Sequence, residues 1–364
     1  KNPMNDVGFF KKLKISEQNK IIKDLQEINE LVTVDKPYRI KLIDCDIPIN
    51  FKAIALKKIA ALRYMEPGAG EFHKLKTWVD TFMKIPFGKY STLPVNMNDG
   101  TEKCHNFMDN AKNVLNSAVY GMNDAKMQIM QMIGQWIANP NAVGTAIAIK
   151  GPPGTGKTTL VKDGISKILQ RDFAFIALGG ATDSSFLEGH GYTYEGSTWG
   201  KIVDILVQSK CMNPVIYFDE LDKISETTKG DEIVNLLIHL TDTSQNSQFT
   251  DKYLGNGIHI DLSRAIFVFS FNDIEKINPI LRDRIQMIRL TDFTVEEKVK
   301  IARDYLLPGI FRDFDETVKE NCQFTDDSLQ YIYTNYCREN FNGGVRKYKE
   351  LLTGIVSRVN MLSL

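Results

Sequence analysis

One short stretch of the sequence has the spacing of a phosphate-binding loop. Residues 151–158 are Gly-Pro-Pro-Gly-Thr-Gly-Lys-Thr, which satisfies the pattern G-x-x-x-x-G-K-[S/T]. Glycines let backbone N–H groups turn toward phosphate oxygens, and a following helix directs its positive dipole end at the same anion. We therefore predict that this stretch binds nucleotide phosphates. Its predicted binding residues are Gly151, Pro152, Pro153, Gly154, Thr155, Gly156, Lys157, Thr158 and Thr159.

The side chains of this loop and a later pair of acids are suited to ATP and Mg²⁺. Lys157 is expected to reach the β- and γ-phosphates, and the Thr158 hydroxyl to ligate the metal. An apolar run at 215–218 leads into Asp219 and Glu220. Any strand can end in acids, so the pair alone is weak evidence. After a phosphate loop, however, we expect Asp219 to hold Mg²⁺ and Glu220 to polarise the attacking water.

These residues need a sheet to position them, and the apolar pattern predicts one. Short apolar runs alternate with helical patterns, which is typical of an α/β fold with a parallel sheet covered by helices. The phosphate loop lies between the first run and a helical pattern beginning near Lys157, as the motif requires. The predicted strands are 146–149, 173–178, 215–218, 265–269 and 287–290.

Helical patterns occupy both sides of this region. Thr294 and Glu297 form a predicted capping box for a helix that begins at Val295, and we expect Pro308 to end that helix. The other predicted helices are 21–32, 51–62, 72–82, 107–119, 124–137, 326–336 and 345–361. The predicted division is an N-terminal helical segment (1–88), a turn-rich linker (89–104), a large nucleotide-binding α/β part (105–290) and a small helical part (291–364).

Composition limits the partners and the compartment. Lys+Arg and Asp+Glu both number 45, so the net charge of zero provides no overall field for nucleic acid or a membrane surface. Nucleic acid is thus an unfavoured partner, although not an excluded one. Five scattered cysteines without a C-x-x-C pair predict free thiols in a reducing compartment. No apolar run is long enough to span a bilayer, so we expect a soluble protein of the cytoplasm or an organelle matrix.

Several longer stretches resemble the ATPase module of Lon-type ATP-dependent proteases, which belong to the AAA+ class. The resemblance covers nearly all of residues 15–364. It implies an AAA+ core with a parallel sheet, a preceding helical segment and an all-α lid. The stretches are "MEPGAGEFHKLKTWVDTFMKIPFGKY", "GPPGTGKTTL", "LGGATDSSFLEGHGYTYEGSTWGKI", "NPVIYFDELDKIS", "NSQFTDKYL" and "EEKVKIARDYLLPGI".

The resemblance also implies roles for residues outside the phosphate loop. Tyr120 and Gly121, in "YGMNDAK", match the segment that borders adenine. Asn272 matches the sensor that helps Glu220 position water; from the sequence alone, an ordinary polar strand terminator is equally well supported. Arg346, in "NGGVRKY", matches a lid arginine that contacts the γ-phosphate, the alternative being a capping or surface role.

Two further segments are expected to act beyond the subunit's own site. Arg284, in "ILRDRIQM", matches the arginine finger that inserts into a neighbouring subunit's site; Arg282 could replace it or form a surface ion pair. Tyr194 matches the pore-loop aromatic that grips an extended polypeptide. Glu195 departs from the usual aliphatic residue there and would favour basic or polar segments. We expect Tyr192 and Trp199 to pack the base of this loop.

Together these features predict an ATP-hydrolysing motor of a Lon-like protease. Its partners would be unfolded or damaged proteins, and a finger acting in trans implies a ring, most simply a homo-hexamer. No peptidase constellation is legible, and the sequence opens with Lys1, so we expect a fragment of a longer chain. Alternatives are a stand-alone Lon-like remodeller, a nucleic-acid-associated AAA+ switch and a nucleotide-binding scaffold that does not turn over.

Overall fold

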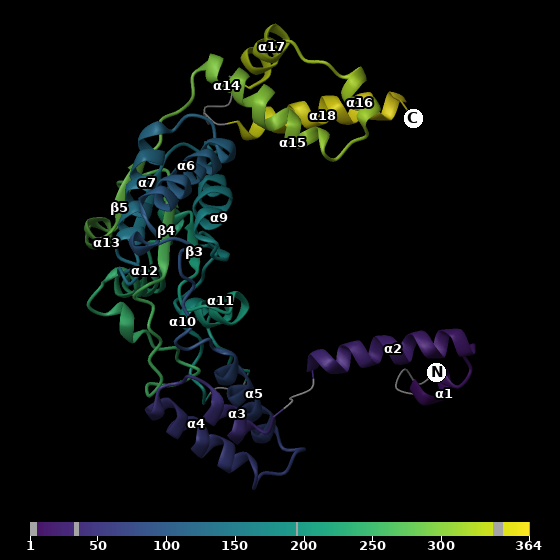
Figure 1. Cartoon of the computed structure of the whole chain (residues 1–364), viewed down its shortest axis with the longest axis vertical. Helices are drawn as coiled ribbons and strands as arrows, with labels where there is room; N and C mark the ends of the chain where they lie inside the picture. Colours follow the sequence, from purple (N-terminus) through teal and green to yellow (C-terminus); the bar gives the residue numbers. More distant parts are fainter. Residues whose placement is uncertain (1–5, 33–35, 194–195, 338–344, 364) are drawn as a thin grey trace. The chain divides into compact units, whose positions relative to one another are not determined.

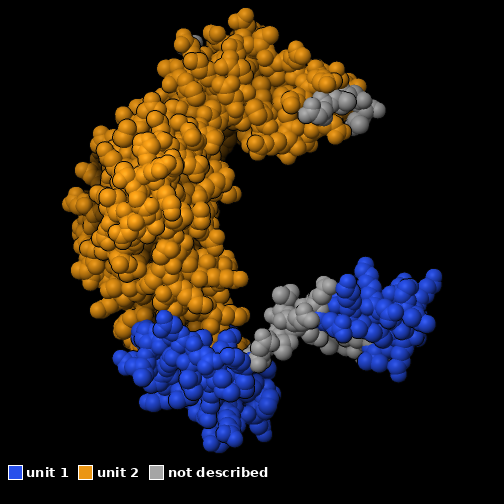
Figure 2. All heavy atoms as spheres, viewed as in Figure 1, with its two compact units in different colours: residues 1–79 blue, residues 80–364 orange. Residues whose placement is uncertain are grey.

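The computed structural model describes residues 6–32, 36–193, 196–337 and 345–363. The chain divides into two compact units, Lys1–Val79 and Asp80–Leu364 (Figure 2). The division falls inside a helix and not at residue 88, and helix α6 begins at Thr101, within the stretch suggested as a linker. The domain limits suggested by the sequence therefore stay proposals.

The first unit is helical, as its apolar spacing predicts. Its helices are α1 (Asp6–Phe10), α2 (Ile15–Val32), α3 (Tyr38–Asp44), α4 (Ile49–Leu62) and the first part of α5 (Gly70–Lys84). Ile59 of α4 and Trp78 of α5 are buried. Lys58 covers the Trp78 ring, its Nζ lying 4.5 Å from the ring centroid. The helices predicted at 21–32, 51–62 and 72–82 are confirmed.

The second unit is built on a five-stranded parallel sheet of order β2-β3-β4-β1-β5. Figure 1 shows this sheet among the helices of the unit, with β3, β4 and β5 labelled. The strands are β1 (Ala146–Lys150), β2 (Phe173–Ala177), β3 (Val215–Asp219), β4 (Ile266–Phe271) and β5 (Gln286–Arg289). All six residues of β4 are buried, because it lies between β1 and β3 with both faces covered. The predicted α/β class and its five strands are confirmed.

Helices cover this sheet and close its core. The helices are α6 (Thr101–Ala118), α7 (Asn123–Ala138), α8 (Lys157–Thr159), the π-helical turn η2 (Leu160–Ile165), α9 (Ser166–Leu169), α10 (Ser185–Glu188), α11 (Lys201–Ser209), α12 (Thr228–Thr241) and α13 (Pro279–Arg284). Leu115 of α6 and Ile133 of α7 pack into the same buried cluster as Ile149 and Val268 of the sheet. Gly164 permits this approach, because a Cβ there would lie 2.9 Å from Leu115 Cδ2.

The remaining helices form a second core. They are α14 (Val295–Ile301), the π-helical turn η5 (Ala302–Leu306), α15 (Leu307–Phe311), α16 (Glu316–Asn321), α17 (Asp326–Tyr336) and α18 (Arg346–Ser363). Leu329, Tyr348 and Leu352 are fully buried in this lid core. The Thr294–Glu297 capping box is confirmed, with both reciprocal hydrogen bonds present.

The prediction that Pro308 ends its helix is wrong. Helical structure continues from η5 into α15, and Pro308 lies in the first turn of α15. A proline there removes an N–H from the helical ladder and crowds the carbonyl one turn earlier. The wider π-helical turn directly before it accommodates both effects. The helix therefore changes its hydrogen-bonding pattern before Pro308 and continues past it.

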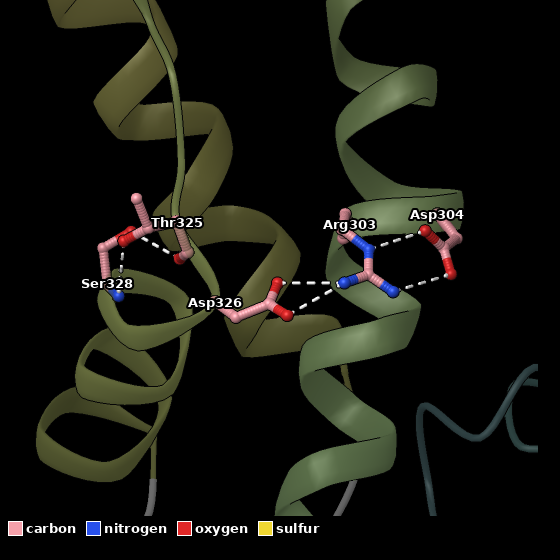
Figure 3. Close-up of polar contacts among 5 residues, drawn as sticks. All are labelled: Arg303, Asp304, Thr325, Asp326 and Ser328. Atoms are coloured by element: carbon pink, nitrogen blue, oxygen red, sulfur yellow. Dashed lines mark hydrogen bonds and ion pairs between the residues drawn. The ribbon is translucent and has the colours of Figure 1, made fainter.

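Polar contacts tie two elements of the lid together. Figure 3 shows Arg303 of η5 donating to both carboxylate oxygens of Asp326, at 3.1 and 2.9 Å. The Arg303 Nε also donates to Asp304 at 2.9 Å. Thr325 caps α17 by accepting from the Ser328 N–H at 3.2 Å. These exposed pairs add little stability, but they join α17 to η5, which carries three residues of the candidate site, Asp304, Tyr305 and Leu306.

Candidate nucleotide-binding site

A cavity of about 910 Å³ lies at the carboxyl end of the sheet. Its lining comes from the loop after β1, the residues after β3 and β4, the end of α6 and the lid. Parallel strands bring their carboxyl ends to one edge, which is where α/β proteins place their ligands. The predicted site residues that line the cavity are Tyr120, Pro153, Gly154, Thr155, Gly156, Lys157, Thr158, Thr159, Asp219, Glu220, Asn272 and Arg346.

The backbone of the phosphate loop requires glycine at several positions. Gly154 and Gly156 have φ angles of 77° and 92°, which side chains rarely tolerate. A Cβ at Gly151 would lie 2.9 Å from Leu290 Cβ, so the loop runs tightly against the end of β5. Thr155 is buried and donates to the Pro152 carbonyl at 2.9 Å. The loop is thus held in one shape by its own residues.

Lys157 joins this loop to the end of β4. Its Nζ donates to Gly151 O and to Asn272 Oδ1, both at 2.6 Å, and to Phe271 O at 3.3 Å. Burial lowers the pKa of Lys157, while Asp219 and Asp222 act in the opposite direction. The structure therefore places the Asn272 side chain beside the lysine, at the cavity wall.

The two acids at the end of β3, Asp219 and Glu220, have different environments. Asp219 accepts from the Ser270 hydroxyl and, at 3.1 Å, from the Glu220 N–H. Glu220 has a left-handed backbone, with φ at 59°, a conformation that costs a non-glycine residue roughly 1–2 kcal/mol. Gly179 leaves room for it, because a Cβ there would lie 2.6 Å from Glu220 Oε2. The Glu220 side chain therefore lies against Gly179, at the start of the segment after β2.

Thr158 and Asp219 fit a magnesium site. Both line the cavity, and a hydroxyl and a carboxylate are hard oxygen donors of the kind Mg²⁺ prefers. Within the described residues no cluster of three or more His, Cys, Asp or Glu side chains could hold a metal by itself. Mg²⁺ is commonly held by one or two protein ligands together with phosphate and water.

The structure adds residues that sequence analysis missed. Asp222 is buried and accepts from the backbone N–H groups of Asn272 and Asp273, at 3.3 and 3.2 Å, which ties the end of β4 to the segment after β3. Its place in "DELD" is the only sequence signal for this role. Phe293 and Tyr305 lie edge-on to Tyr120, with ring centroids 6.4 and 6.3 Å away.

The lid reaches the phosphate loop directly. The Val345 N–H donates to Gly154 O at 3.2 Å, and Arg346 begins α18 at the cavity wall. Gly121, next to Tyr120, has a φ of 62° and lies 4.0 Å from Phe293 at its would-be Cβ. Tyr120 and Arg346 thus lie at the cavity, on the side formed with the lid, whereas the predicted residues Gly121, Gly151 and Pro152 are not among its described lining residues.

Arg284 is held elsewhere. Among the described residues that line the cavity, Arg284 is not present. Its Nη1 lies 2.5 Å from Asp242 Oδ2, at the end of α12. Hydrogen bonds from Ser244 and the Arg284 guanidinium lower the pKa of Asp242 to about 2. Arg282 is exposed and forms no ion pair within the described part of the chain.

Comparison with known proteins agrees with this geometry. Residues 147–293 match the family described as ATPase family associated with various cellular activities (AAA). The chain is 32% identical to a Lon protease homolog of Acanthamoeba polyphaga mimivirus over 98% of its own length and 34% of that relative. It is also 32% identical to the mitochondrial Lon protease homolog of Drosophila melanogaster, over 95% of this chain and 32% of the relative.

The Lon protease of Chlamydia pneumoniae gives the same picture, with 32% identity over 92% of this chain and 39% of the relative. The chain is a Lon-like AAA+ module. It spans about a third of the length of the curated relatives it matches. The AAA match implies that the module binds nucleotide. None of the helices in its described segments is both long enough and apolar enough to cross a membrane.

The Lon-like module carries a second feature, the base of the loop at 189–200. Tyr194 and Glu195 lie outside the described residues. The rings of Tyr192 and Trp199 pack on Tyr253, at centroid distances of 5.6 and 6.0 Å, which confirms that they form the base of the loop. The His190 N–H donates to Thr198 O at 3.1 Å, which joins the two ends of the loop.

A buried aspartate accepts a hydrogen bond from one end of this loop and lies close to the other. Asp251 is fully buried and accepts from the Gly200 N–H at 2.8 Å and from the Tyr253 and Leu254 N–H groups at 2.8 and 3.2 Å. A Cβ at Gly189 would lie 2.9 Å from Asp251 Oδ1. Nothing in the local sequence distinguishes Asp251 from a surface acid, so sequence analysis missed it.

Asp251 makes the stability of the module depend on pH. Burial raises its pKa from 3.8 to about 6, so near pH 5 the folded state holds a proton that the unfolded chain does not. Its contribution is present at low pH and is lost as pH rises through 6. We expect wild type to gain about 1–1.5 kcal/mol relative to Asp251→Asn between pH 7.5 and pH 5, measured by urea unfolding.

Asp242→Asn is the matched control. Because the pKa of Asp242 is lowered to about 2, this carboxylate stays ionised from pH 5 to 7.5, and the stability difference between wild type and this variant should not change over that range. An Asp251→Asn difference that is equally flat would contradict the assignment.

Proposed function

We propose that this module hydrolyses ATP with Mg²⁺ to unfold and translocate protein substrates, as the motor of a Lon-like ATP-dependent protease. One observation carries the proposal: a single cavity gathers Lys157, Thr158, Asp219, Glu220 and Asn272 from three separate strand ends. We assign no peptide-bond hydrolysis to these residues. The five cysteines, all free thiols in the structure, support an intracellular, reducing compartment such as the cytoplasm or an organelle matrix.

Each of these five residues has a role in this proposal. The Lys157 ammonium, held now by Gly151 O and Asn272 Oδ1, would turn to the β- and γ-phosphates, which are stronger acceptors. Thr158 and Asp219 would hold Mg²⁺, which neutralises charge on the phosphate oxygens when bound. Glu220 would orient the attacking water and accept its proton, and Asn272 would position that water from the opposite side.

The adenine and the γ-phosphate would meet the lid. Tyr120 and Gly121 are proposed to border the base, supported by the aromatic group that Tyr120 forms with Phe293 and Tyr305. Arg346 is proposed to contact the γ-phosphate from the first turn of α18. Closure of the lid on nucleotide would then strengthen the contact between α18 and the phosphate loop.

Arg284 is proposed to complete the site of a neighbouring subunit, which requires a ring, most simply a homo-hexamer. Two observations support this role. Arg284 is not among the described residues that line the cavity of its own subunit. Asp242 holds the Arg284 guanidinium at the end of α13 instead. Tyr194 is proposed to grip the substrate from the loop whose base is fixed by Asp251 and Tyr253. Glu195 would bias that grip toward basic or polar segments.

Glu220→Gln tests the catalytic base. The amide keeps the shape of the side chain but cannot accept a proton, so we expect phosphate release to fall at least about 100-fold. Affinity for a fluorescent ATP analogue should stay within about twofold. Glu226→Gln, an exposed acid outside the cavity, is the control. Turnover retained by Glu220→Gln would remove Glu220 from its role.

Mixing two inactive variants tests the finger in trans. Arg284→Ala and Glu220→Gln should each be inactive alone. In mixed rings, a site with an intact Glu220 can receive the finger of a Glu220→Gln neighbour, so about a quarter of the sites should recover in a random 1:1 mixture. Arg282→Ala should keep activity without mixing. If the mixture stays inactive while both variants assemble, Arg284 does not act across a subunit boundary.

The response of ATPase activity to polypeptide tests the grip. Activity should rise with protein concentration and rise further when an unfolded protein is added. Tyr194→Ala should keep basal turnover within about twofold and lose most of the added stimulation, because a large aromatic contact is removed. Tyr64→Ala, an 87% exposed tyrosine of the first unit, is the control. Stimulation by single-stranded nucleic acid instead would favour the nucleic-acid switch.

A further inference from the structure

A buried tyrosine lies directly behind the proposed metal ligands. Tyr217, in the middle of β3, is fully buried, and its ring packs on Phe173 and Phe175 at centroid distances of 5.7 and 5.9 Å. Its hydroxyl lies 3.2 Å from Thr158 Oγ1. An apolar side chain would satisfy the core equally well, so the hydroxyl itself needs a reason.

The Tyr217 hydroxyl lies in a chain of polar groups between Thr158 and Asp219. Thr158 Oγ1 donates to the Tyr217 oxygen at 3.2 Å. Ser270 lies on the same face of the sheet as Tyr217, because Tyr217 pairs with Val268, two residues before Ser270 on β4. Ser270 in turn donates to Asp219 Oδ1. Two hydroxyls, from β3 and β4, thus lie between the two residues that are suited to ligate Mg²⁺.

The end of this chain sets the direction of every hydrogen in it. A carboxylate has only acceptors, so the Ser270 hydrogen points to Asp219. That leaves the Ser270 oxygen free to accept the Tyr217 hydrogen, while the Tyr217 oxygen accepts from Thr158. The Thr158 hydrogen is therefore directed at Tyr217. The lone pairs of the Thr158 oxygen are then left for a ligand in the cavity. In a chain of this kind, each hydrogen bond strengthens its neighbours.

We propose that Tyr217 is a positioning residue that holds the Thr158 hydroxyl ready for Mg²⁺ and links it, through Ser270, to Asp219. This rests on the proposed ATP·Mg²⁺ function and deepens it. Without the Tyr217 oxygen, the Thr158 hydroxyl would have to find another acceptor or rotate its lone pairs out of the cavity. The expected loss is in metal affinity, with little loss in nucleotide affinity measured without metal.

Tyr217→Phe removes one oxygen and keeps the aromatic packing. We expect the Mg²⁺ concentration that half-saturates binding of a fluorescent ADP analogue to rise about 5- to 10-fold, at the lower end of effects seen when a partner of a metal ligand is removed. Affinity for the same analogue in EDTA should change less than about twofold. The urea midpoint serves as the folding check.

Ser270→Ala breaks the same chain one step further along and provides a second variant should Tyr217→Phe fold poorly. It should raise the Mg²⁺ requirement similarly, and combining the two changes should add less than about twofold to either alone, because they interrupt one chain. Tyr348→Phe is the control: this buried lid hydroxyl donates to Leu329 O, away from the cavity, and its loss should leave the Mg²⁺ requirement unchanged.

The outcomes separate the two proposals. If wild type binds the analogue neither with Mg²⁺ nor in EDTA, the proposed nucleotide function fails. If wild type shows a Mg²⁺ requirement and both Tyr217→Phe and Ser270→Ala keep it within about twofold, only the positioning role is overturned. An equal loss of affinity in EDTA and in Mg²⁺ would also overturn it, because that result marks a general packing defect.

Discussion

The contact between Lys157 and the end of β4 is the interaction on which the site depends. Lys157 Nζ donates to Gly151 O and Asn272 Oδ1 at 2.6 Å each, so a single cation joins the two ends of the phosphate loop to the neighbouring strand. This is possible only because β4 lies between β1 and β3. That order places the phosphate loop, the acids after β3 and the polar residues of β4 at one edge.

Backbone strain is found at the same edge of the sheet. Glu220 adopts a left-handed backbone immediately after the strand, a cost that the tightly packed sheet can bear because β3 and β4 are almost wholly buried. Gly179, which makes room for Glu220, begins the segment that leads to the loop at 189–200. The residue proposed to activate water therefore contacts the start of the segment proposed to move substrate.

Buried carboxylates fix the positions of particular backbone segments of the module. Asp251 holds the loop base through three backbone N–H groups, and Asp222 holds the end of β4 through two. Each carboxylate would be costly to bury without such partners. Their hydrogen bonds offset that cost and define single positions for segments that apolar packing alone would leave less well ordered.

Local spacing in the sequence determined the phosphate loop, the five strands, the Thr294–Glu297 cap and the acids Asp219 and Glu220, because these signals lie within a few neighbouring residues. The prediction that Pro308 ends its helix was wrong, because the effect of this proline depends on the turn before it. Only the tertiary structure decided the roles of Asp251, Asp222, Tyr217 and Ser270. Each of them has at least one partner far away in sequence, as with Ser270 and Asp219, 51 residues apart. Such contacts form only once the tertiary fold brings the two segments together.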